Sequence, residues 1–516
     1  MPDLPFIGLL SGPANFLRNM VTKDPGFMLA NMVRDSMAAY VTSGVKMTPI
    51  ADTIRNFGKA MANTSPEYEA LLNAGIGGGY EFSQNIEMSG KAFQKELNKK
   101  YEGKTLFQRI LNPMTAPTSL WEALEKGTTA SDMATRIEVY KRTLAETNNE
   151  AEALHRALEV MNFNRKGSSP VIRILTAAIP FLNARMQGLD VLYRASFGKM
   201  NNKDAAMIQK RFIVRGLTMA ALSAMYWTLT HDDEEYKKQE QETKDNNWLI
   251  PSLGIKIPIP FEIGVIFKVI PERIMALTLG QDTNKDFMDS MARNLRSTLA
   301  IDYLPQAIKP FVETETNFSL FTRRPIVGQG LEGVAPEFQV GPGTSSVAAA
   351  IGSNLGMSPM KIDHLIGGYT GTMGMYMVSA LDGIMNMNAE NPNASKRFEQ
   401  MPFIKRFALD PEARGTVTGY YDLKNATDEV VRTSSLLERT MNFEERGKFM
   451  QENIKLLANK DYILDLEKTM KNFRQAQVMI RSSNMDADAK KEALLRINQA
   501  QNALTANINM LRANVM

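Results

Sequence analysis

The sequence contains no cysteine among its 516 residues and only three histidines, His155, His231 and His364. The lack of cysteine excludes disulfides, a thiolate nucleophile and cysteine-ligated metal sites in this chain. The three histidines lie far apart and have no partner at the i+3 or i+4 spacing of a helical metal site. We therefore predict no metal ion and no cofactor, and we assign no catalytic, cofactor-binding or metal-ligating residue.

The chain also lacks a marked excess of charge of either sign. It has 60 Lys and Arg residues and 56 Asp and Glu residues, so the formal net charge is only +4. Salt-dependent binding of nucleic acid usually comes with a clustered basic stripe, and none stands out here. We expect no more than non-specific contact with DNA. Methionine, in contrast, is abundant at 34 residues. Its flexible thioether suits cores, and surfaces that repack.

A secretory signal is lacking as well, because the N-terminus carries Asp3 where a basic segment belongs. The longest strongly apolar run without charge spans residues 216–230, which is shorter than the roughly 20 residues that a membrane-spanning helix needs. A second uncharged stretch, rich in glycine and methionine, spans residues 365–381. We interpret these runs as buried core helices, with insertion into a membrane as the alternative.

Apolar residues recur at helical spacing through most of the chain, which predicts a mainly α fold. We expect an extended multi-helix assembly with loops rich in proline and glycine. It divides into an N-terminal helical region (1–205), a central region with an apolar helix, a proline-rich corner and loops (206–385), and a C-terminal helical region (386–516).

The last segment of the chain keeps a three–four heptad rhythm on both sides of a turn, with Asp486 as a good helix N-cap. This pattern predicts an antiparallel helical hairpin with coiled-coil-like packing. A glutamine in each half of the seam favours a specified register. The expected seam consists of Ile463, Leu466, Met470, Phe473, Gln477 and Ile480, followed by Leu494, Ile497, Gln501, Leu504, Ile508, Leu511 and Val515.

The stretch from Trp248 to Arg273 holds four prolines among large apolar residues and organises the centre of the chain. Pro258 and Pro260 favour extended backbone before them, so residues 255–257 are predicted to form a short β-like segment. Pro260 can occupy the first turn of a helix, and Pro271 then ends or kinks that helix. We expect a rigid, buried corner between helices.

Glu262 lies in this corner among apolar neighbours, and a carboxyl group in such a place can have a raised pKa and act as an acid. The surrounding prolines favour a structural joint instead. In that interpretation Glu262 meets a buried donor, and the candidates are Arg185, Arg215 and Arg273.

Polar side chains also occur within two other apolar helical segments. Asn183, Arg185 and Gln187 follow an Ile-Pro-Phe-Leu segment, and if they are buried they need partners, because an unsatisfied polar group costs roughly 1–3 kcal/mol. Arg34 and Asp35 form either a buried ion pair or a solvated helix face.

Three further patterns resemble binding or catalytic motifs but lack the surrounding sequence that such sites require. Residues 328–333 match the G-x-G-x-x-G spacing, yet no strand precedes them and Pro336 follows where the helix of a dinucleotide site should begin. The pair Asp232 and Asp233 has no polar cluster that obviously converges on it. The arginine pair at 323–324 could bind phosphate, but a lone pair of arginines is usually a surface feature.

Seven short segments then carry a family resemblance. They are 24–35, 179–188, 232–248, 257–273, 336–345, 358–363 and 368–372, and they include Asp-Pro-Gly-Phe, Ile-Pro-Phe-Leu-Asn-Ala-Arg-Met-Gln-Gly and Ile-Pro-Ile-Pro-Phe-Glu-Ile-Gly. In this order they resemble the helical C-terminal region of large polyvalent phage proteins, called a large polyvalent protein-associated domain. They also resemble the C-terminal parts of internal virion (DNA-ejection) proteins of short-tailed phages.

The resemblance implies a non-enzymatic phage virion structural protein. Such a protein belongs to the internal core or the DNA-ejection apparatus, is packaged in the capsid and is delivered with the genome to the host cell envelope. Enzymatic modules of these proteins, such as a transglycosylase, lie upstream of this region. The resemblance begins near Met1 here, so we expect a stand-alone version or a fragment of a longer polyvalent protein.

The implied partners are portal, core or tail proteins, further copies of the chain, the host envelope membrane and, non-specifically, packaged DNA. One alternative function is a host-directed effector or helical binding module that uses the terminal hairpin. Another is an unrecognised all-α enzyme, which the lack of cysteine, the scattered histidines and the lack of a convergent carboxylate pair disfavour.

Overall fold

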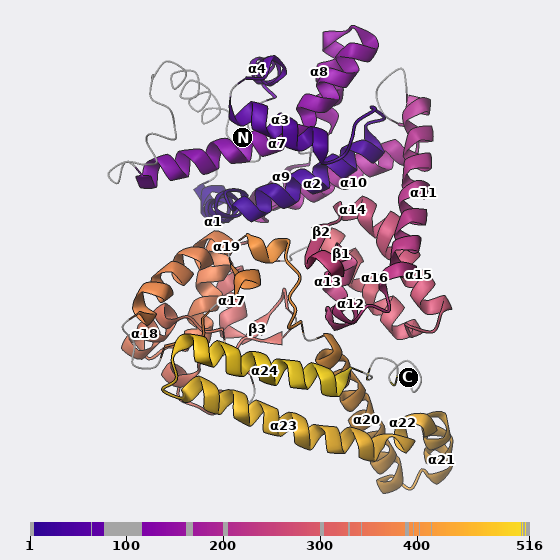
Figure 1. Ribbon diagram of the computed structural model, residues 1–516, viewed down its shortest axis with the longest axis vertical. Helices are drawn as coiled ribbons and strands as arrows, with labels where there is room; N and C mark the ends of the chain where they lie inside the picture. The colour runs from indigo at the N-terminus through magenta and orange to yellow at the C-terminus, as the bar shows by residue number, and fades with distance from the viewer. Residues whose placement is uncertain are drawn as a thin grey trace. The chain divides into compact units, whose positions relative to one another are not determined.

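The computed structural model describes residues 5–299 apart from 63, 77–115, 161–168 and 200–204, and residues 304–511 apart from 323, 329–330, 342, 388–391, 396, 402, 414, 507 and 509–510. Within these residues the chain is mainly α, as expected, and its strands form two small two-stranded sheets (Figure 1). The chain divides into two compact units. Unit 1 comprises residues 1–217, 258–263 and 296–385, and unit 2 comprises residues 218–257, 264–295 and 386–516.

The units are interleaved along the sequence. The expected N-terminal region (1–205) lies wholly in unit 1 and the expected C-terminal region (386–516) wholly in unit 2, while the central region is shared between them. Whether the three regions are separate domains stays a prediction.

The first part of unit 1 is a helical array built around α7. It consists of α1 (Pro5–Thr22), α2 (Pro25–Thr42), α3 (Ala51–Met61), α4 (Pro66–Asn73), α7 (Ala116–Thr147), α8 (Glu150–Glu159), α9 (Pro170–Ala178), α10 (Leu182–Ser196) and the first half of α11 (Ala205–Thr230). The start of α2 follows from its sequence, because the Asp24 carboxylate accepts from the Gly26 N–H at 2.9 Å and Pro25 needs no N–H in the first turn.

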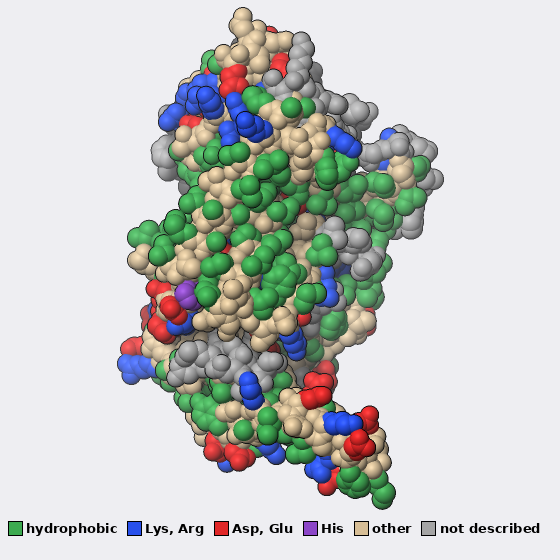
Figure 2. All heavy atoms as spheres, turned by 90° about the vertical axis from the view of Figure 1, so that its right-hand side faces the viewer, with side chains coloured by type: hydrophobic (Ala, Val, Ile, Leu, Met, Phe, Trp, Pro, Cys, Tyr) green, Lys and Arg blue, Asp and Glu red, His purple; other side chains and the backbone are tan. Residues whose placement is uncertain are grey.

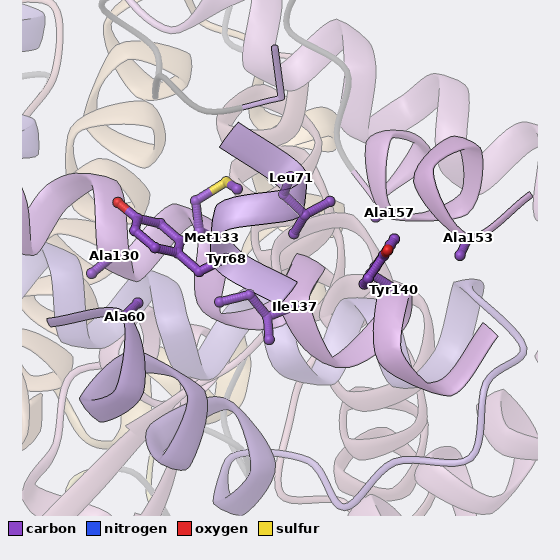
Figure 3. Close-up of a cluster of buried hydrophobic side chains, with 9 residues drawn as sticks. All are labelled: Ala60, Tyr68, Leu71, Ala130, Met133, Ile137, Tyr140, Ala153 and Ala157. Atoms are coloured by element: carbon purple, nitrogen blue, oxygen red, sulfur yellow. The ribbon is translucent and has the colours of Figure 1, made fainter. Parts of the chain in front are cut away.

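The core of this array is formed by side chains that α3, α4, α7 and α8 direct toward one another (Figure 3). Small residues let the helices approach closely, while Tyr68, Leu71, Met133, Ile137 and Tyr140 fill the space between them. The small members are Ala60, Ala130, Ala153 and Ala157.

The second part of unit 1 has short elements and ends in a broken helix. It contains α17 (Lys309–Glu315), β3 (Phe318–Ser319), β4 (Arg324–Pro325), η5 (Pro336–Phe338), α18 (Ser346–Leu355) and α19 (Pro359–Asn386). β3 and β4 are antiparallel, with Phe318 opposite Pro325 and Ser319 opposite Arg324. α19 is interrupted at Gly371, whose φ of 62° and ψ of −157° are not helical.

Unit 2 begins with the second half of α11 and ends with the C-terminal hairpin. Between them lie α12 (Glu234–Lys238), α13 (Gln241–Asn246), β1 (Asn247–Ile250), η2 (Pro251–Leu253), β2 (Ile255–Pro258), α14 (Phe261–Gly264), the π-helix η3 (Val265–Val269), α15 (Ile270–Thr278), α16 (Asn284–Leu299), η6 (Phe398–Gln400), η7 (Ile404–Arg406), α20 (Gly415–Arg439), α21 (Phe443–Glu452) and α22 (Ile454–Ala458). Some of these elements, such as α14, cross a unit boundary.

The proline-rich stretch 248–273 agrees with its prediction in several local features. Residues 255–258 form β2, which pairs with β1, and Pro260 immediately precedes the first residue of α14. Before Pro271 the helix does not end but passes through the π-helix, in which the Ile270 N–H bonds to the Val265 carbonyl. The stretch is only partly buried, since Leu253 and Phe261 are exposed.

The C-terminal hairpin forms as predicted, with α23 (Lys460–Ser482) and α24 (Ala487–Thr505) joined by a turn that Asp486 caps. Gln477 and Gln501 meet in its seam, where the Gln477 amide donates to the Gln501 side-chain oxygen at 3.3 Å. Seam residues such as Ile463 also pack against α20 in one hydrophobic core, so the seam is closed by a third helix. Val515 lies outside the described residues, and coiled-coil geometry stays a prediction.

Candidate functional site

Three segments distant in sequence meet in unit 1, at α2, α10 and the start of α14. The Arg34 guanidinium lies 4.5 Å from the centre of the Phe261 ring, and its Nε donates to the Ile259 carbonyl at 3.3 Å. The Glu262 carboxylate lies against Gly188, where a Cβ would be only 2.9–3.1 Å from the carboxylate atoms. Glycine at 188 therefore makes room for Glu262.

Glu262 has a raised pKa because burial disfavours its charged form. Its own backbone N–H and the positive charge of Arg185 partly offset that effect. Of the three candidate donors, Arg185 is the one that acts on Glu262. Arg215 instead donates to the Tyr40 and Val45 carbonyls.

Asp35 belongs to the same cluster, and its pKa is raised to about 7. Burial is the largest cause, and the nearby Asp132 carboxylate adds to it, whereas Arg136 and Arg34 act in the opposite direction. Asp35 is thus neither a solvated residue nor half of a simple ion pair. Asn183 and Gln187 are buried on α10. The cluster joins α2, α7, α10 and α14 and can hold a proton near neutral pH.

A second charge cluster lies in unit 2, centred on Asp245 at the end of α13. Its carboxylate accepts from the Ser290 hydroxyl at 2.7 Å and from Arg293 at 3.1 Å, and it lies 3.8 Å from Arg273 Nε. Burial opposes ionisation of Asp245, but the charge of Arg273 and the Ser290 hydrogen bond outweigh it and hold its pKa below the usual value.

Lys268 and Glu272 complete this cluster one helical turn apart, with their charged groups 2.9 Å apart. Both side chains are fully buried, and the Lys268 ammonium also donates to the Lys244 carbonyl. Burial raises the pKa of Glu272 against the opposing effect of Lys268. Arg273 bonds Asp282 at 2.8 Å. The cluster ties α13, the π-helix, α15 and α16 together.

Sequence reasoning did not select Asp245, Lys268, Glu272 or Asp282. One signal was present, because Lys268 and Glu272 have the i, i+4 spacing of a helical ion pair within an apolar run. Asp245, in contrast, lies in a charged segment that is typical of a solvated helix, and nothing local distinguishes it from its neighbours.

The histidines take ordinary roles where partners are described. His231 stacks on Trp227 with ring centres 4.4 Å apart, and His364 Nε2 lies 3.0 Å from Glu313. Asp233 caps α12 by accepting from two backbone N–H groups. Across the part of the chain that the structure describes, no group of three or more His, Asp or Glu side chains could hold a metal ion.

The G-x-G-x-x-G segment is described only in part, because residues 329–330 and the neighbouring arginine at 323 lie outside the described residues. Gly328 and residues 331–333 lie in turns, and the next regular element is the three-residue η5. No α-helix therefore begins where a dinucleotide site would need one.

Helix α11 is much less buried than expected. It is 26 residues long, and only 22% of its most apolar 18-residue window is buried. By length and composition it is the one helix among the described residues that could cross a membrane, although core helices pass the same test. Figure 2 shows hydrophobic side chains gathered on the face of the chain that carries α11. The expectation of a buried core helix was wrong, because periodicity does not show how many faces are covered.

The second apolar stretch, residues 365–381, is broken at Gly371 rather than continuous. Most of its residues are partly buried, and Gly374 and Val378 are buried. Its C-terminal end and the following turn of helix expose apolar residues, namely Met377, Leu381, Ile384 and Met385.

Comparison with known proteins adds one finding. Residues 233–404 match the family model of large polyvalent protein associated domain 38. The match confirms the expected resemblance for this part of the chain, whereas the segments at 24–35 and 179–188 lie outside it. No curated protein and no solved structure matches the chain.

Proposed function

The chain carries a large polyvalent protein associated domain at residues 233–404, and from this premise we propose that it is a non-enzymatic structural component of a phage particle. The domain indicates a phage polyvalent protein. In the proposal the chain is packaged in the capsid, as part of the internal core or the DNA-ejection apparatus. It reaches the host cell envelope together with the genome.

The observation that supports this role best is the exposure of apolar helix faces. α11 exposes Leu217, Leu222 and Leu229, and the end of α19 exposes Leu381 and Ile384. Extended apolar surfaces of this kind mark sites that meet other proteins or membranes. In the proposal these faces contact portal, core or tail proteins and further copies of the chain, and packaged DNA is contacted only non-specifically.

The two charge clusters fit the same role. Inside unit 2, Asp245 joins α13 to α15 and α16 through Arg273 and Ser290, and Lys268, paired with Glu272, also contacts the Lys244 carbonyl of α13. In unit 1, the positive charge of Arg185 on α10 acts on the buried Glu262 of α14. Such groups stabilise a particular packing of helices, which a structural component requires.

The test is quantitative mass spectrometry of purified phage particles before and after DNA ejection. The proposal expects the protein in full particles, at a fixed copy number relative to the major capsid protein, and a several-fold loss of it from emptied particles. Its absence from full particles would overturn the proposal. Detection in infected cells but not in particles would favour the host-directed effector instead.

A further inference from the structure

The exposed face of α11 forms one continuous apolar band, here called the α11 stripe. It consists of Ile213, Val214, Leu217, Ala221, Leu222, Met225 and Leu229, with Thr218 and Thr228 between them. The members recur at spacings of one, three and four positions, so they lie on one face of the helix. At 1.5 Å per residue the stripe is about 24 Å long.

The N-terminal half of α11 packs within unit 1 through the helix face opposite the stripe. Arg215 donates to the Val45 carbonyl at 3.0 Å and to the Tyr40 carbonyl, and Arg211 donates to the Gly44 carbonyl. Ile208 and Phe212 are buried there. In the C-terminal half, Trp227 belongs to a core cluster of unit 2. The helix is therefore anchored by its other face, and the stripe is not needed for that anchoring.

The stripe offers almost nothing polar to a partner. Residues 216–230 contain no charged side chain. The Thr228 hydroxyl already bonds within the helix, to the Ala224 and Met225 carbonyls at 3.1 and 2.7 Å. Protein–protein interfaces normally surround an apolar centre with polar contacts, at roughly one hydrogen bond per 100–200 Å². A band about 24 Å long with so few donors and acceptors fits hydrocarbon better.

Basic and aromatic groups gather at the N-terminal end of the stripe, whereas the acidic residues 232–235 follow its C-terminal end. The Gln209 amide donates to the Ser196 carbonyl at 2.8 Å, which places the end of α10 beside the start of α11. Phe197 and Lys199 are exposed just after Ser196, the last residue of α10, and Lys210 is exposed on α11 itself. Basic and aromatic residues beside an apolar band suit the headgroup level of an anionic membrane.

We propose that the α11 stripe is a membrane-contact surface, which lies along an anionic bilayer with its apolar side chains at the acyl-chain boundary. A helix with one apolar face and one anchored face binds in the plane of the interface. Crossing the bilayer would instead expose Arg211 and Arg215 to hydrocarbon. This inference deepens the proposed function by naming the surface that the delivered protein meets, and it rests on that function only for the choice of a bacterial, anionic bilayer.

The first test is flotation of the full chain with vesicles of phosphatidylcholine and phosphatidylglycerol at 70:30. We expect Leu222→Glu to lower the bound fraction at least about tenfold, because a charge at an apolar membrane position costs several kcal/mol. Leu436→Glu is the matched control, since Leu436 is a similarly exposed leucine on α20. Its binding should equal that of the natural chain. Equal binding by the Leu222→Glu variant would overturn the proposal.

The second test uses the lack of cysteine, which allows single-site labelling without background. An environment-sensitive dye at Leu217→Cys or Leu222→Cys should shift to shorter wavelength on addition of vesicles, and one at Lys468→Cys, an exposed site on α23, should not. No shift at either stripe position would overturn the proposal.

Two outcomes distinguish membrane contact from self-association and from the virion role. If Leu222→Glu converts an oligomer to a monomer in solution and the natural chain does not float, the stripe is a contact between copies and the proposal fails. If the chain floats but is absent from phage particles, the membrane surface stands and the proposed virion role fails.

Discussion

The buried pair Lys268–Glu272 allows a sharp test of the charge cluster in unit 2. We predict that Lys268→Met lowers the stability of this unit strongly at neutral pH. The substitution leaves the Glu272 carboxylate buried without its partner at 2.9 Å. Breaking a buried ion pair on one side typically costs about 3–5 kcal/mol.

The pKa of Glu272 sets the pH dependence of this loss. Its ordinary value is 4.5, and burial already raises it in the folded chain. A carboxyl group whose folded pKa exceeds its unfolded pKa loses stability as the pH rises above the unfolded value. Without Lys268 this pKa should rise further, because Lys268 is the strongest of the influences that lower it. The loss should then grow with pH above 4.5, by at most about 1.4 kcal/mol per pH unit or about 4 kcal/mol by pH 7.5, and should be small at pH 5.

The assay is urea unfolding followed by tryptophan fluorescence in a Trp121→Phe background. The two remaining tryptophans, Trp227 and Trp248, both lie in unit 2 and report on it alone. The double variant Lys268→Met/Glu272→Gln removes both charges and should regain most of the loss. An equal loss at pH 5 and pH 7.5, or no recovery in the double variant, would refute the reasoning.

Three further predictions concern unit 1. The pKa of Asp35 is about 7 in the folded chain, against an ordinary value of 3.8, so its ionisation destabilises the folded state at high pH. In urea titrations, Asp35→Asn should therefore stabilise the unit by about 1–3 kcal/mol at pH 8, and this gain should shrink toward zero as the pH falls to 4. In thermal melts, Gly371→Ala should lower the stability of the unit by about 2–4 kcal/mol, because the φ of Gly371 is positive and a Cβ there would lie 2.8 Å from Val21. The control Gly383→Ala has open space around the new Cβ and should be neutral or slightly stabilising. Gly188→Ala should lower the stability of the unit by about 1–3 kcal/mol, because the new Cβ displaces the Glu262 carboxylate. The control Gly58→Ala, at a position with open space, should cause no loss. Equal melting temperatures of the two variants would contradict the packing of Glu262 against Gly188.

The C-terminal hairpin was predictable because its information is local. The heptad rhythm identified Ile463, Leu466 and Met470, all of which are buried, and Asp486 caps α24 as expected. The third helix, α20, could not be predicted, because no periodicity within 460–511 shows what covers the outside of a seam. Because the hairpin shares its core with α20, a truncation before Tyr462 would remove four of the nine buried residues of that core. Such a truncation would not test binding by the hairpin alone.

The candidate sites were predictable only in part. Glu262 was selected from its apolar neighbours, and Arg185 was among its expected donors. Asp245 was missed because its partners Arg273, Ser290 and Arg293 are 28 to 48 residues away in sequence. Local sequence identifies an unusual residue, but tertiary packing decides whether a charged residue is buried and which charge it meets.

The distribution of polarity in this chain is partly inverted, since Lys268, Glu272 and Asp245 are buried while Leu217, Leu222 and the rest of the α11 stripe are exposed. Exposed apolar area gives no stabilisation until another medium covers it. A bilayer that covers the stripe binds the folded chain, so it should stabilise that state in proportion to the logarithm of vesicle concentration. We therefore predict that anionic vesicles at 100 times the dissociation constant raise the free energy of unfolding by about 2.7 kcal/mol in the natural chain and have no effect on the Leu222→Glu variant. Equal stabilisation of both proteins in thermal melts would show that the vesicles act elsewhere on the chain.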